Sequence, residues 1–382
     1  MRRASELEQR RLGETFARLC SISSPSGPER GVAEYLQAEL GAMGVEVSED
    51  DSADRLGGDC GNLFARVGPT DAPQLLLCAH MDTVGDERAV RPVFRDGGWV
   101  SDDEAILGAD NKAAVAVIVE LARRVAIEGA PVGVELCFTV REEQALRGAY
   151  EVDTRRFSSA VGYVFDHATP IGEVISASPT YVQWEAVLEG RAAHAGISPE
   201  DGRNAIVAAS RAIARIPSGR IDATTTANVA AIFGGTATHG TNIVAPDCRV
   251  TGEARSLEEG VAERLADEVV EAFHDAANAP ECSCDVDVTL ERSFEGYRVD
   301  PDEPGARVAL AALRSCGHEP LLVESGGGSD ANAFRSAGLP VINLANGTER
   351  PHLPDERVSG EALEQMLDVT IALTEQAGAE LR

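Results

Sequence analysis

The chain of 382 residues is poor in lysine and aromatic residues. Lys112 is its only lysine, and aromatic residues make up 4% of it. The 34 basic residues face 63 acidic ones, which gives a formal net charge of −29 at pH 7. Such a surface repels nucleic acid and anionic membranes, so we expect neither as a partner. Codon bias toward arginine, alanine and glycine is one explanation of this composition, and adaptation to high salt is the alternative.

Long hydrophobic runs are also missing. None approaches the roughly 20 residues that a membrane-spanning helix needs. The first ten residues are charged and lack an apolar signal core, so we expect a cytoplasmic protein. The eight cysteines are scattered, and several lie inside apolar runs, which favours buried, reduced thiols over disulfides.

The length fits two domains. Strand and helix patterns alternate in the first part of the chain, which predicts an α/β fold with a mostly parallel sheet. Continuous apolar runs mark the buried strands. The main expected elements are a helix over 29–43, strands over 75–79, 132–140 and 161–165, and a helix over 113–127.

The pattern changes near Ser178 to β-α-β-β-α-β, a ferredoxin-like unit. Its expected strands cover 181–188, 225–233, 249–254 and 286–291, and its helices cover 204–216 and 258–277. The α/β pattern then resumes, with helices over 307–316, 330–337 and 360–376 and strands over 321–324 and 341–344. We therefore expect one discontinuous domain, 1–178 and 293–382, that is interrupted by a second, 179–292.

Acidic and imidazole side chains stand where several expected strands end, the usual place for ligands on such sheets. In extended backbone, residues two apart point the same way, so Asp82 can reach His80. A carboxylate on the second ring nitrogen is what a metal-binding histidine needs. A surface histidine beside a turn aspartate is the alternative.

Four further places continue the pattern. Asp110 precedes a helix and could simply cap it. Glu142 and Glu143 follow a strand directly; two adjacent carboxylates repel unless a cation holds them, although a solvated pair in a turn is equally open. Asp166 ends another strand, and His352 lies in a loop after a later one.

Together these residues form a set of imidazole and carboxylate groups that suits zinc, cobalt or manganese. Five ligands are too many for one tetrahedral zinc. They fit two ions about 3.5–4 Å apart, with one carboxylate shared between them.

The sequence resembles a known family, the co-catalytic zinc exopeptidases, which include peptidase T, glutamate carboxypeptidase and the aminoacylases. It is most similar to the peptidase T-like members, over nearly the whole chain. The matching stretches are 78–83, 108–112, 141–143, 165–166, 191–196, 241–242, 252–256, 325–330 and 349–352.

The resemblance implies a role for each residue. His80 and Asp166 would hold one zinc and Glu143 and His352 the other, with Asp110 bridging, Asp82 orienting His80 and Glu142 acting as the base. The inserted domain would be a lid that makes a homodimer. Its residues His194, Asn242 and Arg255 would contact substrate, and Gly327 and Gly328 of the main domain would line the pocket floor.

The expected activity is hydrolysis of short peptides by two divalent ions, most simply zinc, with cobalt or manganese possible. Asp166 favours an aminopeptidase of tri- or dipeptides, since relatives with glutamate there tend to be carboxypeptidases or deacylases. A deacylase or carboxypeptidase with the same metal site is the alternative, and a non-catalytic metal-binding protein is another. Asn111, where many relatives have aspartate, and His167 depart from the family pattern.

Overall fold

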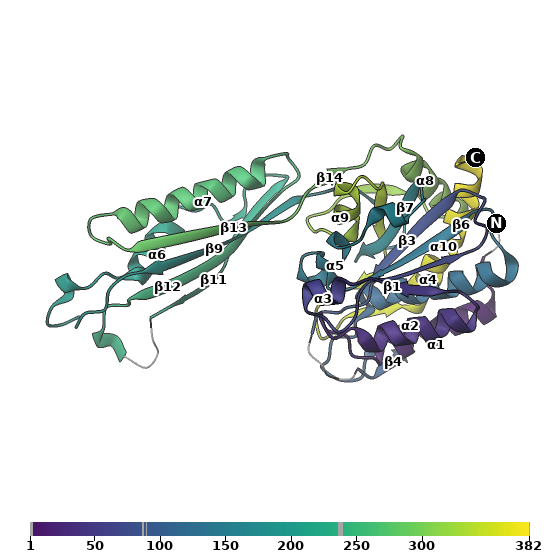
Figure 1. Cartoon of the computed structure of the whole chain (residues 1–382), viewed down its shortest axis with the longest axis horizontal. Helices are drawn as coiled ribbons and strands as arrows, with labels where there is room; N and C mark the ends of the chain where they lie inside the picture. The colour runs from purple at the N-terminus through teal and green to yellow at the C-terminus, as the bar shows by residue number, and fades with distance from the viewer. Residues whose placement is uncertain (1–2, 86–87, 89, 236–239, 382) are drawn as a thin grey trace. The chain divides into compact units, whose positions relative to one another are not determined.

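The computed structural model describes residues 3–85, 88, 90–235 and 240–381. The chain forms two compact units (Figure 1). One comprises Met1–Ala177 and Arg298–Arg382, and the other comprises Ser178–Tyr297. The second unit is therefore inserted into the first.

Among the described residues, the first unit contains a nine-stranded sheet. Its strands are β1 (Val47–Glu49), β2 (Leu63–Val67), β3 (Gln74–His80), β6 (Gly133–Thr139), β7 (Val161–His167), β8 (Glu173–Ser178), β14 (Tyr297–Arg298), β15 (Leu321–Glu324) and β16 (Val341–Ala345).

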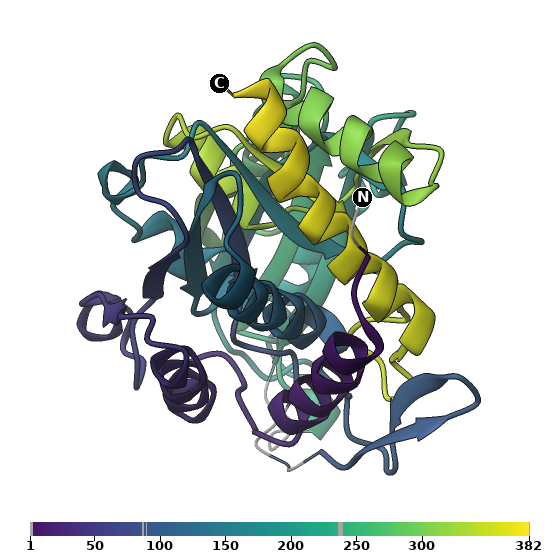
Figure 2. The same cartoon turned by 90° about the vertical axis from the view of Figure 1, so that its right-hand side faces the viewer.

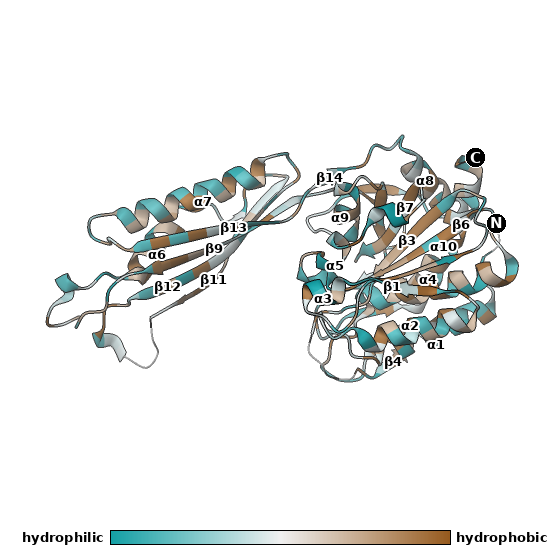
Figure 3. Ribbon diagram, in the orientation of Figure 1, coloured by the Kyte–Doolittle hydropathy of each residue, from teal (hydrophilic) through white to brown (hydrophobic). Residues whose placement is uncertain are grey.

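The strand order is β1-β2-β6-β3-β7-β16-β8-β14, with β15 beside β8. The four central strands, β6, β3, β7 and β16, are parallel, as the sequence predicts. The edge formed by β1 and β2 is antiparallel. Every residue of β3 and β6 is buried, and Figure 3 shows these strands in mostly hydrophobic colours. This burial explains their continuous apolar sequences.

Helices pack against this sheet. α4 contacts both α1 and α10 and is buried over most of its length, and Figure 2 shows these helices in front of the sheet. An Ala- and Val-rich helix that is apolar on all sides belongs in such an interior. The helices are α1 (Glu6–Cys20), α2 (Arg30–Ala42), α3 (Ser52–Leu56), α4 (Ala109–Glu128), α5 (Arg147–Tyr150), α8 (Pro304–Cys316), α9 (Asp330–Ser336) and α10 (Gly360–Glu380).

A small sheet that the sequence does not predict lies beside these helices. Its four strands are β4 (Pro92–Arg95), β5 (Gly98–Ser101), β17 (Thr348–Glu349) and β18 (Arg357–Ser359). Trp99 of β5 contacts Phe16 of α1 edge-on, with 5.8 Å between ring centroids, and so fixes the hairpin to the helical layer.

The second unit is the expected β-α-β-β-α-β arrangement, with one short strand added. Its sheet has the order β10-β11-β12-β9-β13 among the described residues and is antiparallel. Both helices cover one face, where Trp184 and Phe273 contact each other in the core. The elements are β9 (Thr180–Glu189), α6 (Ala205–Ile213), β10 (Gly219–Arg220), β11 (Thr225–Gly234), β12 (Asp247–Ser256), α7 (Val261–Asn278) and β13 (Asp285–Phe294).

All eight cysteines are buried free thiols, which confirms the expectation of reduced cysteine. Across the described part of the chain, no helix combines the length and apolar character needed to cross a bilayer.

Candidate metal centre

Five elements of the first unit bring the acidic and imidazole side chains together. His80 is the last residue of β3, and Asp166 lies near the end of β7. Glu142 and Glu143 occupy the turn after β6. Because β6, β3 and β7 are parallel neighbours, their carboxyl ends meet at one edge of the sheet. The first turn of α4 adds Asp110, and the loop between β17 and β18 adds His352.

The carboxylate of Asp110 lies between the two histidines. Its Oδ1 is 3.4 Å from His80 Nε2, and its Oδ2 is 3.4 Å from His352 Nε2. Each histidine has a second carboxylate beside the same nitrogen. Asp166 Oδ1 lies 3.7 Å from His80 Nε2, and Glu143 Oε1 lies 3.1 Å from His352 Nε2. The geometry is that of two adjacent ligand groups sharing one carboxylate.

Asp82 is fully buried behind His80. His80 Nδ1 lies 2.9 Å from the Asp82 carbonyl oxygen and 3.4 Å from its carboxylate, which leaves Nε2 directed at the cluster. The same carboxylate accepts the backbone N–H groups of Glu142 (3.0 Å) and Glu143 (3.2 Å). Asp82 therefore orients the histidine and also holds the turn that carries both glutamates.

The cluster is strongly acidic, and its pKa values are displaced accordingly. Burial opposes protonation of His80, but its carboxylate neighbours outweigh burial and raise its pKa well above the usual value. The adjacent carboxylates of Asp110 and Glu143 raise the pKa of His352 to about 10. Burial, reinforced by the charge of Asp166, raises the pKa of Glu142 far above its ordinary range. Positive charge at the centre of this cluster would relieve the repulsion.

The donor set fits divalent metal ions. Asp110 Oδ1 and Glu143 Oε1 are buried and have no hydrogen-bond partner, so each carries an uncompensated desolvation cost. Within the described residues, one group that could hold an ion comprises His80, Glu142 and Asp166, and another comprises His80, Asp110 and Glu143. Glu142 is therefore near enough to His80 and Asp166 to be a ligand of an ion that those two residues would hold.

Asp110 does not cap its helix. The residue before α4 is Gly108, in a left-handed conformation (φ 75°) without a side-chain cap, and the Asp110–Asn111 peptide bond is cis. The buried Glu356 accepts the N–H groups here instead. Burial, with a contribution from Asp110, raises the pKa of Glu356 to about 7. Glu356 is not predicted from the sequence, where its position four residues after His352 is its sole signal.

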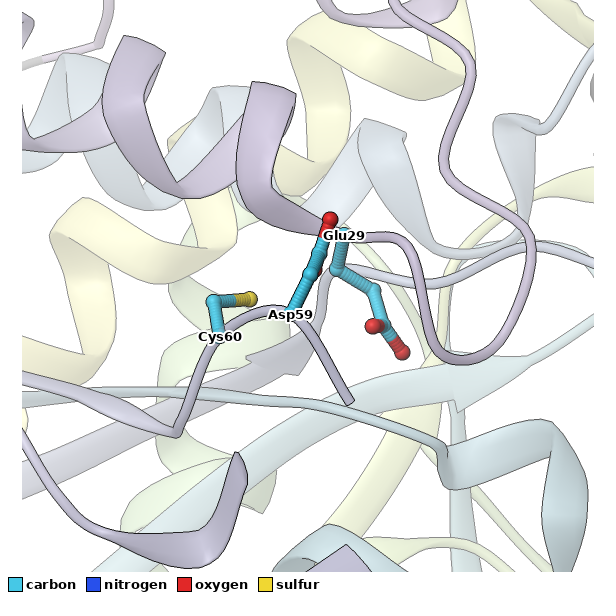
Figure 4. A group of neighbouring side chains, drawn as sticks. All are labelled: Glu29, Asp59 and Cys60. Atoms are coloured by element: carbon cyan, nitrogen blue, oxygen red, sulfur yellow. The ribbon is translucent and has the colours of Figure 1, made fainter. Parts of the chain in front are cut away.

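A third acidic group, Glu29, Asp59 and Cys60, lies elsewhere in the described part of the unit. One ligand atom of each side chain lies within 4.8 Å of the others, and Figure 4 shows the three side chains beside one another. Glu29 Oε1 accepts the N–H of Arg141 at 3.1 Å, immediately before Glu142 and Glu143. Glu29 therefore supports that turn, a role that is not predicted from its position at the start of an expected helix.

The expected substrate residues of the second unit fall into two places. His194 and Asn242 lie together, since the N–H of Ala195 donates to the Asn242 carbonyl at 2.8 Å. Both belong to loops beyond the Asp247 end of β12. Arg255 lies toward the other end of β12, roughly 26 Å away at the usual strand rise.

Arg255 is engaged within its own unit. Its guanidinium pairs with both carboxylate oxygens of Glu253, at 3.1 and 3.2 Å, and lies 3.9 Å above the Tyr181 ring. This pairing shows that the Arg255 guanidinium can bind a carboxylate through two hydrogen bonds.

The remaining expected residues belong to loops. Gly327 and Gly328 are half-buried between β15 and α9, and the N–H of Gly327 donates to Ser325 Oγ at 3.0 Å. His167 enters none of the candidate metal groups of the described residues. His239, a possible substrate contact by its position near Asn242, lies outside the described residues.

Comparison with known families gives two matches. Residues 178–280 match the peptidase dimerisation domain, and residues 62–167 match peptidase family M28. The chain is also 35% identical to the uncharacterized protein YqjE of Bacillus subtilis, over 97% of this chain and 99% of that protein.

Two solved structures are similar throughout. The aminopeptidase PepT of Bacillus cereus is 35% identical, with a TM-score of 0.86 over 96% of this chain and 98% of the other. A tripeptidase of Staphylococcus aureus is 31% identical, with a TM-score of 0.91 over 97% and 99%.

The fold, the imidazole–carboxylate cluster and these relatives define a metallopeptidase that acts as an exopeptidase on peptides. The chain belongs to the peptidase T-like family of M20 metallo-exopeptidases. The family resemblance seen in the sequence is thereby confirmed.

Proposed function

We propose that this protein is a two-zinc aminopeptidase that releases the N-terminal residue of tri- and dipeptides. The observation that carries the proposal is the position of the Asp110 carboxylate, with one oxygen 3.4 Å from each of two histidines. His80 and Asp166 would complete one metal site. His352 and Glu143 would complete the other. Imidazole with carboxylate, and no thiolate, suits zinc, cobalt or manganese.

Bound divalent ions would polarise the peptide carbonyl and lower the pKa of water. Glu142 is then the group that moves protons. It lies beside the cluster, mostly buried, and burial raises its pKa, so it can accept a proton from the attacking water and deliver it to the leaving amine. Asp82 fixes the turn, so that Glu142 stays in place during both transfers.

Two observations support short substrates with a free amino terminus. The Bacillus cereus structure is described as an aminopeptidase and the Staphylococcus aureus structure as a tripeptidase. The cluster is rich in carboxylates, which favours a substrate ammonium group nearby. Arg255 would bind the substrate carboxylate in place of Glu253, and this contact would limit substrate length.

A matched pair of substrates tests this assignment. We expect a free tripeptide to lose its N-terminal residue, and the same tripeptide with an acetylated amino group to be a much poorer substrate, because acetylation removes the ammonium charge. Products are identified by mass spectrometry with zinc, cobalt and manganese in turn. Faster release of the acetyl group would replace the aminopeptidase with a deacylase.

We also propose that the protein works as a homodimer with shared sites. The dimerisation-domain match covers most of the second unit. His194 and Asn242 lie at the end of its sheet opposite to Thr180 and Phe294, near which the chain enters and leaves the unit. Because His194 and Asn242 lie far along the unit from both chain connections, we propose that they enter the site of a second subunit.

Mixing two inactive variants checks the shared site. Glu142→Ala and His194→Ala dimers should each be inactive, whereas exchange of subunits should restore part of the activity. The reason is that one site in each mixed dimer contains both an intact Glu142 and an intact His194. Activity is followed with a tripeptide after exchange has been verified by native mass spectrometry. Proven exchange without recovery would place His194 outside a partner's site.

A further inference from the structure

We propose that Glu356 is a positioning residue that holds the backbone of residues 108–110 and so keeps the Asp110 carboxylate beside His352, where both would bind metal ions. The inference rests on the proposed metal centre. It adds a residue outside the ligand set.

The contacts of Glu356 all lie at one turn. Its Oε2 accepts the N–H groups of Gly108 at 2.6 Å and Ala109 at 3.1 Å, and its Oε1 accepts that of Asp110 at 3.3 Å. Glu356 is 1% exposed. Buried N–H groups without acceptors lower the stability of a fold. The Glu356 carboxylate stabilises this turn because it accepts three N–H groups that water does not reach.

An aspartate that caps a helix accepts N–H groups two or three residues further along the chain, which here are those of Lys112 and Ala113. Asp110 does otherwise. Its backbone (φ −81°, ψ 106°) and that of Asn111 (φ −118°, ψ 25°) are non-helical, and its carboxylate faces the two histidines. Glu356 holds the backbone up to and including Asp110, and the Asp110 carboxylate lies beside the two histidines.

Glu356 also joins two ligand segments. It lies four residues after His352, in the loop between β17 and β18, and its contacts are with the segment that carries Asp110. The distance from Asp110 Oδ2 to His352 Nε2 therefore depends on a buried bond between the two segments. Partners that orient metal ligands typically contribute 10–100-fold to metal affinity.

Glu356→Gln tests the role with little change in shape. The amide oxygen can replace Oε2 and keep the Gly108 and Ala109 contacts, but the amide NH₂ then faces the N–H of Asp110, donor against donor. Zinc and cobalt ions are titrated into the metal-free full chain by calorimetry. We expect at least one of the two ions to bind about 10–100-fold more weakly than in the unchanged protein.

Glu135→Gln is the matched control. Glu135 is also 1% exposed and accepts the N–H groups of Ser158 and Ser159, but it lies near the start of β6, away from the cluster. It should keep the metal affinity of the unchanged protein. If Glu356→Gln does not fold, Glu356→Asp, whose carboxylate is one methylene short of the turn, is titrated with the same expectation of weaker binding.

The unfolding temperature of each metal-free variant is measured beside its metal affinity. A merely structural role would lower that temperature in Glu356→Gln and leave both affinities unchanged, and this result would overturn the inference. Failure of the unchanged protein to bind metal would instead contradict the proposed metal centre. The two failures are therefore distinguishable without any assay of peptide cleavage.

Discussion

Replacing Glu142 by glutamine is expected to lower kcat at least about a hundredfold, since general acid–base catalysis is typically worth 10²–10⁴. Glutamine keeps the size of the side chain but cannot take a proton from water. The turn itself should persist, because Asp82 binds the backbone N–H of residue 142 and not its side chain. Both metal ions should remain bound. Steady-state kinetics with a tripeptide and metal analysis of the same sample provide the two readings.

Glu143→Gln is the natural comparison, because the two residues are neighbours on one turn. Glu143 Oε1 lies 3.1 Å from His352 Nε2, so loss of the Glu143 carboxylate should weaken metal binding directly. The comparison matters because Glu142 is itself within ligand reach of His80 and Asp166. Equal loss of metal from both variants would make Glu142 a ligand and remove it as the base.

Removal of metal should abolish peptide cleavage altogether. Without the ions, the cluster has buried carboxylate oxygens that lack partners and no means of polarising the substrate. Activity should return when zinc, cobalt or manganese is added back, and magnesium should restore little because imidazole ligands do not suit it. The measurement is tripeptide hydrolysis after treatment with a chelator and dialysis.

The location of the metal centre is predictable from the sequence because central strands of the sheet are parallel. His80, Asp166 and the two glutamates each stand at the end of a continuous apolar run, and parallel strands bring such ends to one edge. The structure places these side chains together, as that reasoning requires. Their individual roles rest on the family resemblance and await the experiments above.

The supporting residues are not predictable in the same way. Glu356 contacts a turn about 250 positions earlier in the chain, and in the sequence it is one more acidic residue in a loop. Asp110 shows the converse. The sequence alone suggests that Asp110 is a helix cap, but in the structure its carboxylate faces the two histidines. Local sequence patterns therefore indicate the candidate metal ligands, whereas the residues that position these ligands are found only from long-range contacts in the structure.

The edges of the fold are also hard to predict. β1 and β18 are three residues long, and β4 and β5 are four each, too short for a clear alternation of apolar and polar residues. The inserted unit presents the opposite case, because its main elements are longer. Its ten-residue strands and 18-residue helix α7 have enough repeats to reveal the β-α-β-β-α-β order.

The number of metal ions per chain at full activity tests the account most directly. Metal-free protein is titrated with zinc. At each step the bound metal is measured by atomic emission, and tripeptide hydrolysis is measured on the same sample. A shared Asp110 carboxylate predicts that activity reaches its maximum at two ions per chain. Full activity at one ion per chain, unchanged by further zinc, would contradict the two-metal centre.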